Sequence, residues 1–194
     1  MTIELSGNLN NPSVLVIGVF HGDEPQGDPL IRKYLKKTPD TKLLMIPCLN
    51  EAGMKAGKRT NANGVDLNRN FPTKNWSDIQ MNAFFGGEAP ASEEETRFVI
   101  DTVEKYQPKV ILTLHAPYRV VNYDGPGEEI ANKIASIIGY PVEPSIGYPT
   151  PGSFGTWAGV ERNIPIITLE LSEDIGIKAL EKPVHKIFEM LEEY

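Results

Sequence analysis

Short apolar runs rich in β-branched residues alternate along the chain with longer stretches in which apolar residues recur every three or four positions. The short runs predict buried strands, and the longer stretches predict amphipathic helices. Strands that alternate with helices are typical of an α/β protein whose central sheet is mixed, mostly parallel and flanked by helices. The four predicted strands are residues 14–20, 42–48, 110–114 and 164–171.

Four amphipathic helices are predicted along the chain. Ser92 has the position of an N-cap for the second helix, with Glu95 three residues later as in a capping box. The third helix fits residues 128–138. On the last helix, His185 lies on the polar side between two lysines, which predicts an exposed residue without a role. The first and last helices take their apolar faces from Leu30, Ile31, Tyr34, Leu35, Ile177, Leu180, Val184, Ile187, Phe188 and Leu191.

The composition is that of one globular domain. With 194 residues, of which 40% are hydrophobic and 23% charged, the chain is long enough to bury a substantial core. Gly and Pro are concentrated in residues 53–64, 85–90 and 147–159, which we interpret as surface loops that carry function and not as linkers between domains. We therefore expect a single domain over residues 1–194.

The charge and the cysteine content limit the binding partners and the cellular compartment that we expect for this protein. A formal net charge of -7 disfavours nucleic acids and membranes as partners, because both need a broad excess of Lys and Arg. Cys48 is the single cysteine, so no intrachain disulfide can form. The start of the chain lacks a basic region, and its first apolar run is too short to cross a membrane. These features predict a cytoplasmic protein.

Three candidate metal ligands follow predicted strands. His21 and Glu24 form an H-x-x-E pair after the strand at residues 14–20, and His115 follows the strand at residues 110–114. Because ligand sites of open α/β sheets lie outside the carboxyl ends of the strands, we expect these side chains in one crevice. Two His and one Glu with an open fourth position are a ligand set of catalytic zinc. The alternatives are a turn-capping His, a Glu that opens a helix and a histidine buried in the core.

Glu170 lies within the apolar strand predicted at residues 164–171. An ionised carboxylate is costly to bury there unless a neighbouring group compensates it. A metal ion and its bound water could compensate the charge, and the carboxylate could then accept a proton from that water as a general base. The alternative is a structural Glu that pairs with a buried Arg.

The most specific string is residues 64–72, Gly-Val-Asp-Leu-Asn-Arg-Asn-Phe-Pro. Together with the upstream H-x-x-E pair, with His115 after a strand and with Glu170 in a late strand, it resembles the zinc metallocarboxypeptidase family over roughly residues 12–172. The resemblance implies a zinc carboxypeptidase-like fold and one zinc ion held by the three candidate ligands, with Glu170 as the general base.

The resemblance also implies substrate-binding residues. Asn68 and Arg69 would grip a substrate carboxylate, Arg59 would polarise the scissile carbonyl, and Tyr148 would close over the substrate. A guanidinium binds carboxylates bidentately and keeps its charge, so arginine suits these positions. Residues 55–74 contain five basic residues and one acidic residue, a local basic patch in an acidic chain. The alternatives are a solvated loop for the basic residues and an aromatic packed on its own loop for Tyr148.

Four strings narrow the resemblance to those family members that trim bacterial cell-wall peptides; they are residues 58–72, 75–76, 92–96 and 147–157. The implied substrate is the muropeptide L-Ala-γ-D-Glu-meso-diaminopimelate, and the implied reaction is hydrolysis of its γ-D-Glu–diaminopimelate amide bond. One alternative is an N-acyl amino acid deacylase of the succinylglutamate desuccinylase or aspartoacylase type. A second is an inactive relative that binds muropeptides as a sensor. The sequence leaves the oligomeric state open.

Overall fold

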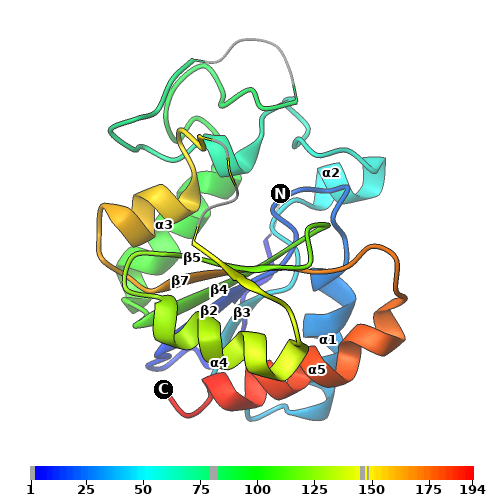
Figure 1. Ribbon diagram of the computed structural model, residues 1–194. Coiled ribbons are helices and arrows are strands. Elements are labelled where there is room, and N and C mark those ends of the chain that lie inside the picture. The colour runs from blue at the N-terminus through cyan, green and yellow to red at the C-terminus, as the bar shows by residue number, and fades with distance from the viewer. Residues whose placement is uncertain (1–2, 79–82, 145–146, 148) are drawn as a thin grey trace.

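A seven-stranded mixed sheet lies at the centre of the structure (Figure 1). The computed structural model describes residues 3–78, 83–144, 147 and 149–194. The strands are β1 (Ser6–Gly7), β2 (Val14–Ile17), β3 (Leu44–Ile46), β4 (Val110–His115), β5 (Val121–Asp124), β6 (Val142–Glu143) and β7 (Ile166–Glu170). Their order across the sheet is β1-β3-β2-β4-β7-β5-β6. Only β1 with β3 and β5 with β7 pair antiparallel among the described strands, so the mixed and mostly parallel sheet predicted from the sequence is confirmed.

Helices cover both faces of the sheet. They are α1 (Gly27–Lys37), α2 (Glu51–Ala56), the 3-10 helix η1 (Leu67–Arg69), α3 (Glu94–Tyr106), α4 (Glu128–Ile138), the π-helix η2 (Gly155–Val160) and α5 (Ile177–Leu191). On β2, Val14 and Val16 pack with α1, α4 and α5 in one hydrophobic cluster, whereas Leu15 and Ile17 pack with α3 and η2 in the other. Alternate strand residues point to opposite faces, so a strand buried on both faces is apolar throughout.

The predicted strands match β2, β3, β4 and β7, although their ends differ. The apolar run after β2 continues to Phe20, but Val19 has a φ of 52° and the strand ends at Ile17. The short strands β1, β5 and β6 were not predicted, because none of them contains an apolar run. The loop predicted at residues 53–64 contains part of α2, and the loop predicted at residues 147–159 contains most of the π-helix η2.

Two local predictions are wrong. Ser92 is not the N-cap of α3, because the cap residue is Glu93 and the Ser92 hydroxyl instead bonds to Asn70 Nδ2 at 2.9 Å and to Glu93 Oε1 at 2.7 Å. His185 is not exposed: only 8% of its surface is accessible, and its Nε2 lies 3.0 Å from the Leu30 carbonyl oxygen. Packing of α5 against α1 covers this edge of the helix.

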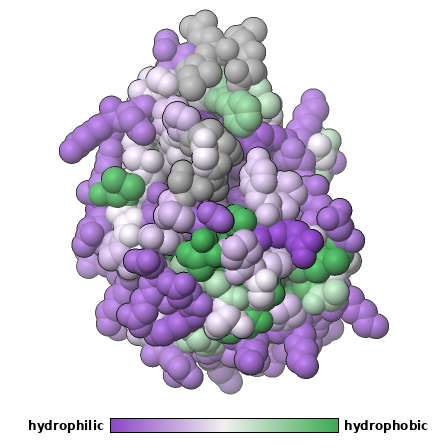
Figure 2. All heavy atoms as spheres, in the orientation of Figure 1, coloured by the Kyte–Doolittle hydropathy of each residue, from purple (hydrophilic) through white to green (hydrophobic). Residues whose placement is uncertain are grey.

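The surface is mostly hydrophilic on the face shown in Figure 2, with hydrophobic areas interspersed. Across the part of the chain that the structure describes, no helix is long and apolar enough to cross a membrane. The large exposed hydrophobic side chains are scattered, which is normal for a protein surface; they are Leu9, Phe84, Tyr118, Val160, Ile175 and Tyr194.

Candidate active site

The carboxyl ends of the parallel strands β2, β4 and β7 meet at one edge of the sheet. His21 and Glu24 follow β2, His115 is the last residue of β4, and Glu170 is the last residue of β7. All four side chains line one cavity of about 470 Å³. The crevice expected at the strand ends therefore exists, and it contains every residue that was placed there from the strand pattern.

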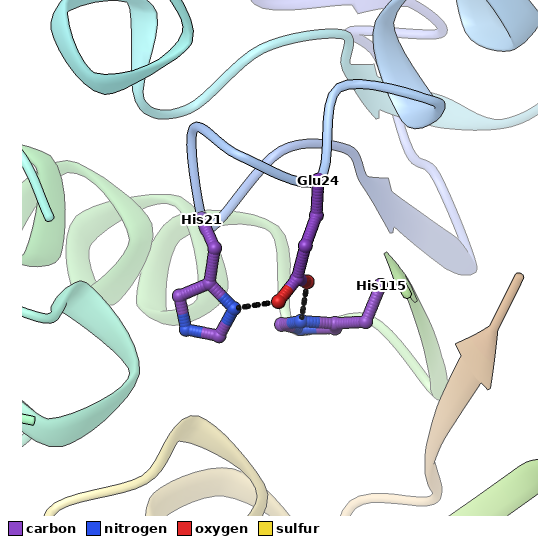
Figure 3. A group of neighbouring side chains, drawn as sticks. All are labelled: His21, Glu24 and His115. Carbon is purple, nitrogen blue, oxygen red and sulfur yellow. Dashed lines mark hydrogen bonds and ion pairs between the residues drawn. The ribbon is translucent and has the colours of Figure 1, made fainter. Parts of the chain in front are cut away.

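Glu24 links the two histidines. Its Oε1 lies 2.9 Å from His21 Nδ1, and its Oε2 lies 3.0 Å from His115 Nδ1 (Figure 3). One ligand atom from each of the three residues lies within 4.8 Å of the others, and all three side chains are buried. Two imidazole nitrogens and one carboxylate oxygen are suitable donors for zinc. The cluster can therefore hold a metal ion.

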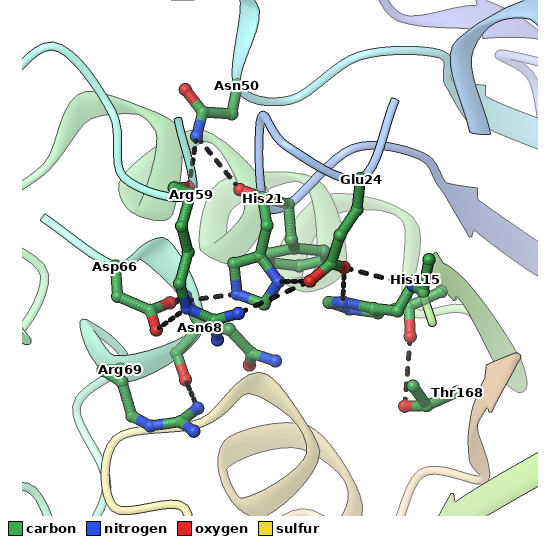
Figure 4. A network of polar contacts seen from close by, with 12 residues as sticks. His21, Glu24, Asn50, Arg59, Asp66, Asn68, Arg69, His115 and Thr168 are labelled. Carbon is green, nitrogen blue, oxygen red and sulfur yellow. Dashed lines mark hydrogen bonds and ion pairs between the residues drawn. The ribbon is translucent and has the colours of Figure 1, made fainter. Parts of the chain in front are cut away.

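Asp66 holds the outer nitrogen of His21. Its Oδ1 lies 3.1 Å from His21 Nε2, and its Oδ2 accepts a hydrogen bond of 2.9 Å from Arg59 Nε (Figure 4). Carboxylates in this position fix the orientation and tautomer of a ligating imidazole. Asp66 is not among the site residues predicted from the sequence. The available signal was a single acidic residue inside an otherwise basic segment.

Charge compensation controls the protonation of this cluster. Burial lowers the pKa of His21, but the carboxylates of Asp66 and Glu24 outweigh burial and raise it to about 9. Burial raises the pKa of Asp66 and of Glu24, but the adjacent histidines, and for Asp66 also Arg59 and Arg69, hold both pKa values far below their usual range. Both carboxylates are therefore ionised at neutral pH.

Glu170 is in a different environment. Only 6% of its surface is accessible, and its buried Oε2 atom has no hydrogen-bond partner among the described residues. Burial raises the pKa of Glu170; His115 opposes this shift and the negative charge of Glu24 adds to it. Buried polar atoms in proteins nearly always have a hydrogen-bond partner, and a group bound in the cavity would supply the partner of this oxygen.

The motif at residues 64–72 and the segment before it place three further residues around the cavity. Arg59 is fixed by Asp66, and its Nη1 also lies 3.4 Å from Glu24 Oε1. Asn68 Oδ1 accepts a hydrogen bond of 2.9 Å from the backbone nitrogen of Phe154, so its amide nitrogen is the group that can donate to a ligand. Arg69, only 5% accessible, donates to the carbonyl of Asn68 at 2.6 Å.

The two guanidinium groups share an aromatic neighbour. The Phe84 ring centre lies 5.1 Å from Arg59 Cζ and 5.7 Å from Arg69 Cζ. Such contacts between a cation and an aromatic ring stabilise the position of the cation. The structure thus brings Arg59, Asn68 and Arg69 to the same cavity as the histidines and Glu170.

Tyr148 lies outside the described residues, so its predicted role stays a prediction. The cavity lining nevertheless includes Thr150, Ser153 and Gly155 from the following segment. Tyr118, three residues after His115, also lines the cavity and was not singled out from the sequence.

Comparison with known proteins identifies the family of this chain. The sequence profile of the zinc carboxypeptidase family matches residues 1–133. Murein peptide amidase A of Escherichia coli (strain K12) is 33% identical over 184 residues, which cover 88% of this chain and 75% of that protein. Murein peptide amidase A of Vibrio campbellii is 30% identical over 200 residues, which cover 94% of this chain and 79% of that protein.

Solved structures are also similar to this chain. Murein-tripeptide amidase MpaA from Escherichia coli O157 superposes with a TM-score of 0.81 at 28% identity, covering 96% of this chain and 83% of that chain. Thrombin activatable fibrinolysis inhibitor has a TM-score of 0.75 at 18% identity, covering 96% of this chain and 64% of that chain, which shows the fold alone. The chain belongs to the zinc carboxypeptidase family and is a hydrolase.

Proposed function

We propose that this chain hydrolyses the amide bond between γ-D-glutamate and meso-diaminopimelate in murein peptides, in the cytosol. The relatives that are 30–33% identical over most of the chain are murein peptide amidases, which supports this substrate class. The observation that carries the proposal is the meeting in one cavity of a His-Glu-His cluster, two arginines and Glu170, whose Oε2 has no hydrogen-bond partner among the described residues.

His21, Glu24 and His115 would hold a single zinc ion through one atom each. A zinc ion bound there would polarise a carbonyl and lower the pKa of bound water to about 7. Asp66 keeps His21 in the orientation that points Nδ1 at the cluster. Glu24 is held between the two histidines and is ionised, so the ligand set is arranged before the ion arrives.

Glu170 would move the protons of the reaction. Its Oε2 has no hydrogen-bond partner among the described residues, so this oxygen is available to accept the proton of the attacking water. The same carboxyl group would then donate that proton to the nitrogen of the departing diaminopimelate. Its raised pKa favours both transfers, because general acid–base catalysis works best when the pKa of the group approaches the working pH.

The arginines and Asn68 would bind the anionic groups of the substrate. A γ-linked D-glutamate keeps its α-carboxylate free beside the scissile carbonyl, and diaminopimelate carries two more carboxylates. Arg69 with the Asn68 amide nitrogen can hold a carboxylate of the diaminopimelate, while Arg59 polarises the carbonyl. The side of the cavity formed by the motif therefore matches the anionic character of a murein peptide.

Mass spectrometry of a muropeptide mixture after incubation with the zinc-loaded protein tests this function. We expect loss of the tripeptide with appearance of the dipeptide L-Ala-γ-D-Glu and free diaminopimelate. N-acetylaspartate and N-succinylglutamate, offered separately, distinguish the alternative N-acyl deacylase. If either compound were cleaved faster than the tripeptide, the deacylase would replace the murein amidase as the proposed function, and the roles of the metal cluster would stay the same. If the protein bound muropeptides without cleaving them, the result would support the inactive sensor.

A further inference from the structure

Phe84 is an aromatic side chain that lines the cavity, and 43% of its surface is accessible. It belongs to neither of the hydrophobic clusters that the described residues form on the two faces of the sheet. Its ring centre lies 5.1 Å from Arg59 Cζ and 5.7 Å from Arg69 Cζ. The main neighbours of this ring at the cavity are therefore the two cations that would bind the substrate.

The backbone next to this ring is fixed against the motif. The Phe85 carbonyl accepts a hydrogen bond of 2.8 Å from the backbone nitrogen of Asp66. The Gly86 carbonyl accepts one of 2.7 Å from Asn70 Nδ2. A Cβ at Gly86 would lie 2.6 Å from the Arg69 carbonyl oxygen, so glycine permits this close approach. These contacts hold the ring near the arginines although its side chain is not packed in the core.

The two guanidinium groups beside the ring differ in how their charge is compensated. Arg59 forms ion pairs with Asp66 and Glu24. Arg69 Nη1 instead donates to the neutral carbonyl of Asn68 (Figure 4). Neighbouring cations repel each other, and the negative face of an aromatic ring attracts both of them. An apolar ring also excludes water from the side of a guanidinium that it covers, which strengthens pairing of that guanidinium with an anion.

We propose that Phe84 is a positioning residue, which fixes the Arg59 and Arg69 guanidinium groups relative to each other. A substrate carboxylate at Arg69 and the scissile carbonyl at Arg59 are then bound in one arrangement. This inference rests on the proposed function and deepens it, because it names the residue on which the joint action of the two arginines depends. The ring has no part in the chemistry and acts through the arginines.

Isothermal titration calorimetry of the zinc-loaded protein with diaminopimelate tests the proposal. Phe84→Leu keeps an apolar side chain but removes the aromatic face, and Phe84→Tyr keeps that face. We expect Phe84→Leu to weaken diaminopimelate binding by about 3- to 30-fold, which is the range for contacts between a cation and an aromatic ring. Phe84→Tyr should bind within about twofold of the wild type, because its ring can attract the same cations.

Steady-state kinetics with the tripeptide shows whether Phe84 acts through Arg69. Residues that act together have non-additive effects on free energy, whereas independent residues have additive ones. The loss of kcat/KM caused by Phe84→Leu should therefore be smaller in an Arg69→Ala background than in the wild type. Two losses that multiply independently would overturn the proposal.

Two further comparisons separate positioning from folding. Tyr194→Leu removes another exposed ring beside a cation, 5.4 Å from Lys133 Nζ, and should bind diaminopimelate as the wild type does. The zinc content and melting temperature of Phe84→Leu should equal those of the wild type, because the ring is not part of the hydrophobic core. Weaker binding together with a matching loss of zinc or a lower melting temperature would make Phe84 a structural residue and overturn the proposal.

The remaining outcomes distinguish this inference from the proposed function. Wild-type affinity in Phe84→Leu, or equally weak binding in Phe84→Tyr, would overturn the positioning role even if the tripeptide is cleaved. So would a wild-type protein that does not bind diaminopimelate, because Arg69 would then hold no carboxylate for the ring to position. Weak binding in Phe84→Leu that Phe84→Tyr restores would support the positioning role even if the tripeptide stays intact, in which case the hydrolysis proposal alone fails.

Discussion

His115 and Glu170 are partners in the register of two neighbouring parallel strands, β4 and β7, and each is the last residue of its strand. A candidate metal ligand and a candidate general base thus lie side by side because of backbone pairing. Their spacing depends on the pairing of these two strands inside the sheet and not on loops. This arrangement keeps Glu170 in the same cavity as the His-Glu-His cluster.

Glu170→Gln should keep the metal and lose turnover. The substitution preserves the shape of the side chain but removes its ability to accept a proton. We expect kcat to fall by at least about 10²- to 10⁴-fold, with KM changed little. Steady-state kinetics measures turnover, and elemental analysis of the same sample measures the metal content. A turnover close to that of the wild type would show that Glu170 is a structural residue.

His21→Ala and His115→Ala should each abolish stoichiometric metal. Wild-type protein is expected to bind one zinc ion per chain, because one ligand atom from each of the three residues lies within 4.8 Å of the others. His185→Asn is the matched control, since His185 lies on α5 and bonds to the Leu30 carbonyl. Elemental analysis after dialysis decides the result, and full metal content in His115→Ala would remove His115 from the ligand set.

Asp66→Asn tests whether Asp66 supports the metal through His21. The amide can still bond to one partner, but it loses the charge that holds both His21 and Arg59. We expect zinc affinity to fall by about 10- to 100-fold, as is typical when a carboxylate behind a ligating histidine is removed. Competition with a zinc chelator measures this affinity. An affinity equal to wild type would contradict the role of Asp66.

Metal binding should release a proton near neutral pH. Without metal, Asp66 and Glu24 raise the pKa of His21 to about 9, so His21 is protonated below that pH and must lose a proton to bind the ion. Zinc affinity is therefore expected to rise with pH from 7 to 9 and to level off above the pKa. Calorimetry in two buffers with different ionisation enthalpies measures the released protons. Release of no proton at pH 7 would contradict the raised pKa.

Site residues that follow apolar strands could be located from the sequence, whereas site residues on less regular segments could not. His21, Glu24, His115 and Glu170 follow or end strands with clear hydrophobic patterns, so the edge at which they meet could be deduced. Strand β5, which contributes Asn122 and Asp124 to the cavity lining, has the sequence Val-Asn-Tyr-Asp and no such pattern.

The missed role of Asp66 and the wrong predictions for His185 and Ser92 also have local causes. Asp66 reaches His21 only through the path of the loop that precedes η1, and spacing alone does not reveal that path. His185 lies at the border of the apolar stripe of α5, where the packing partner decides exposure. Ser92 could cap α3, but Asn70 and Glu93 bind its hydroxyl instead.

Arg69→Ala should weaken transition-state binding of the tripeptide. Because Arg69 is nearly inaccessible, its pairing with a substrate carboxylate would be desolvated, and we expect kcat/KM to fall by the equivalent of about 2–5 kcal/mol. Arg69→Lys should recover only part of this loss, since lysine cannot bind bidentately. Arg32→Ala, at an exposed ion pair with Asp28 and Glu4, is the control and should keep the wild-type kcat/KM. Full activity of Arg69→Ala would show that Arg69 does not bind a substrate carboxylate.

The rate of diaminopimelate release from synthetic L-Ala-γ-D-Glu-meso-diaminopimelate tests the proposed function most directly. The zinc-loaded wild-type protein should produce free diaminopimelate and the dipeptide in equal amounts, and removal of the metal with a chelator should stop the reaction until zinc is restored. An intact tripeptide after prolonged incubation with fully metal-loaded protein, or an unchanged rate after metal removal, would contradict the proposal.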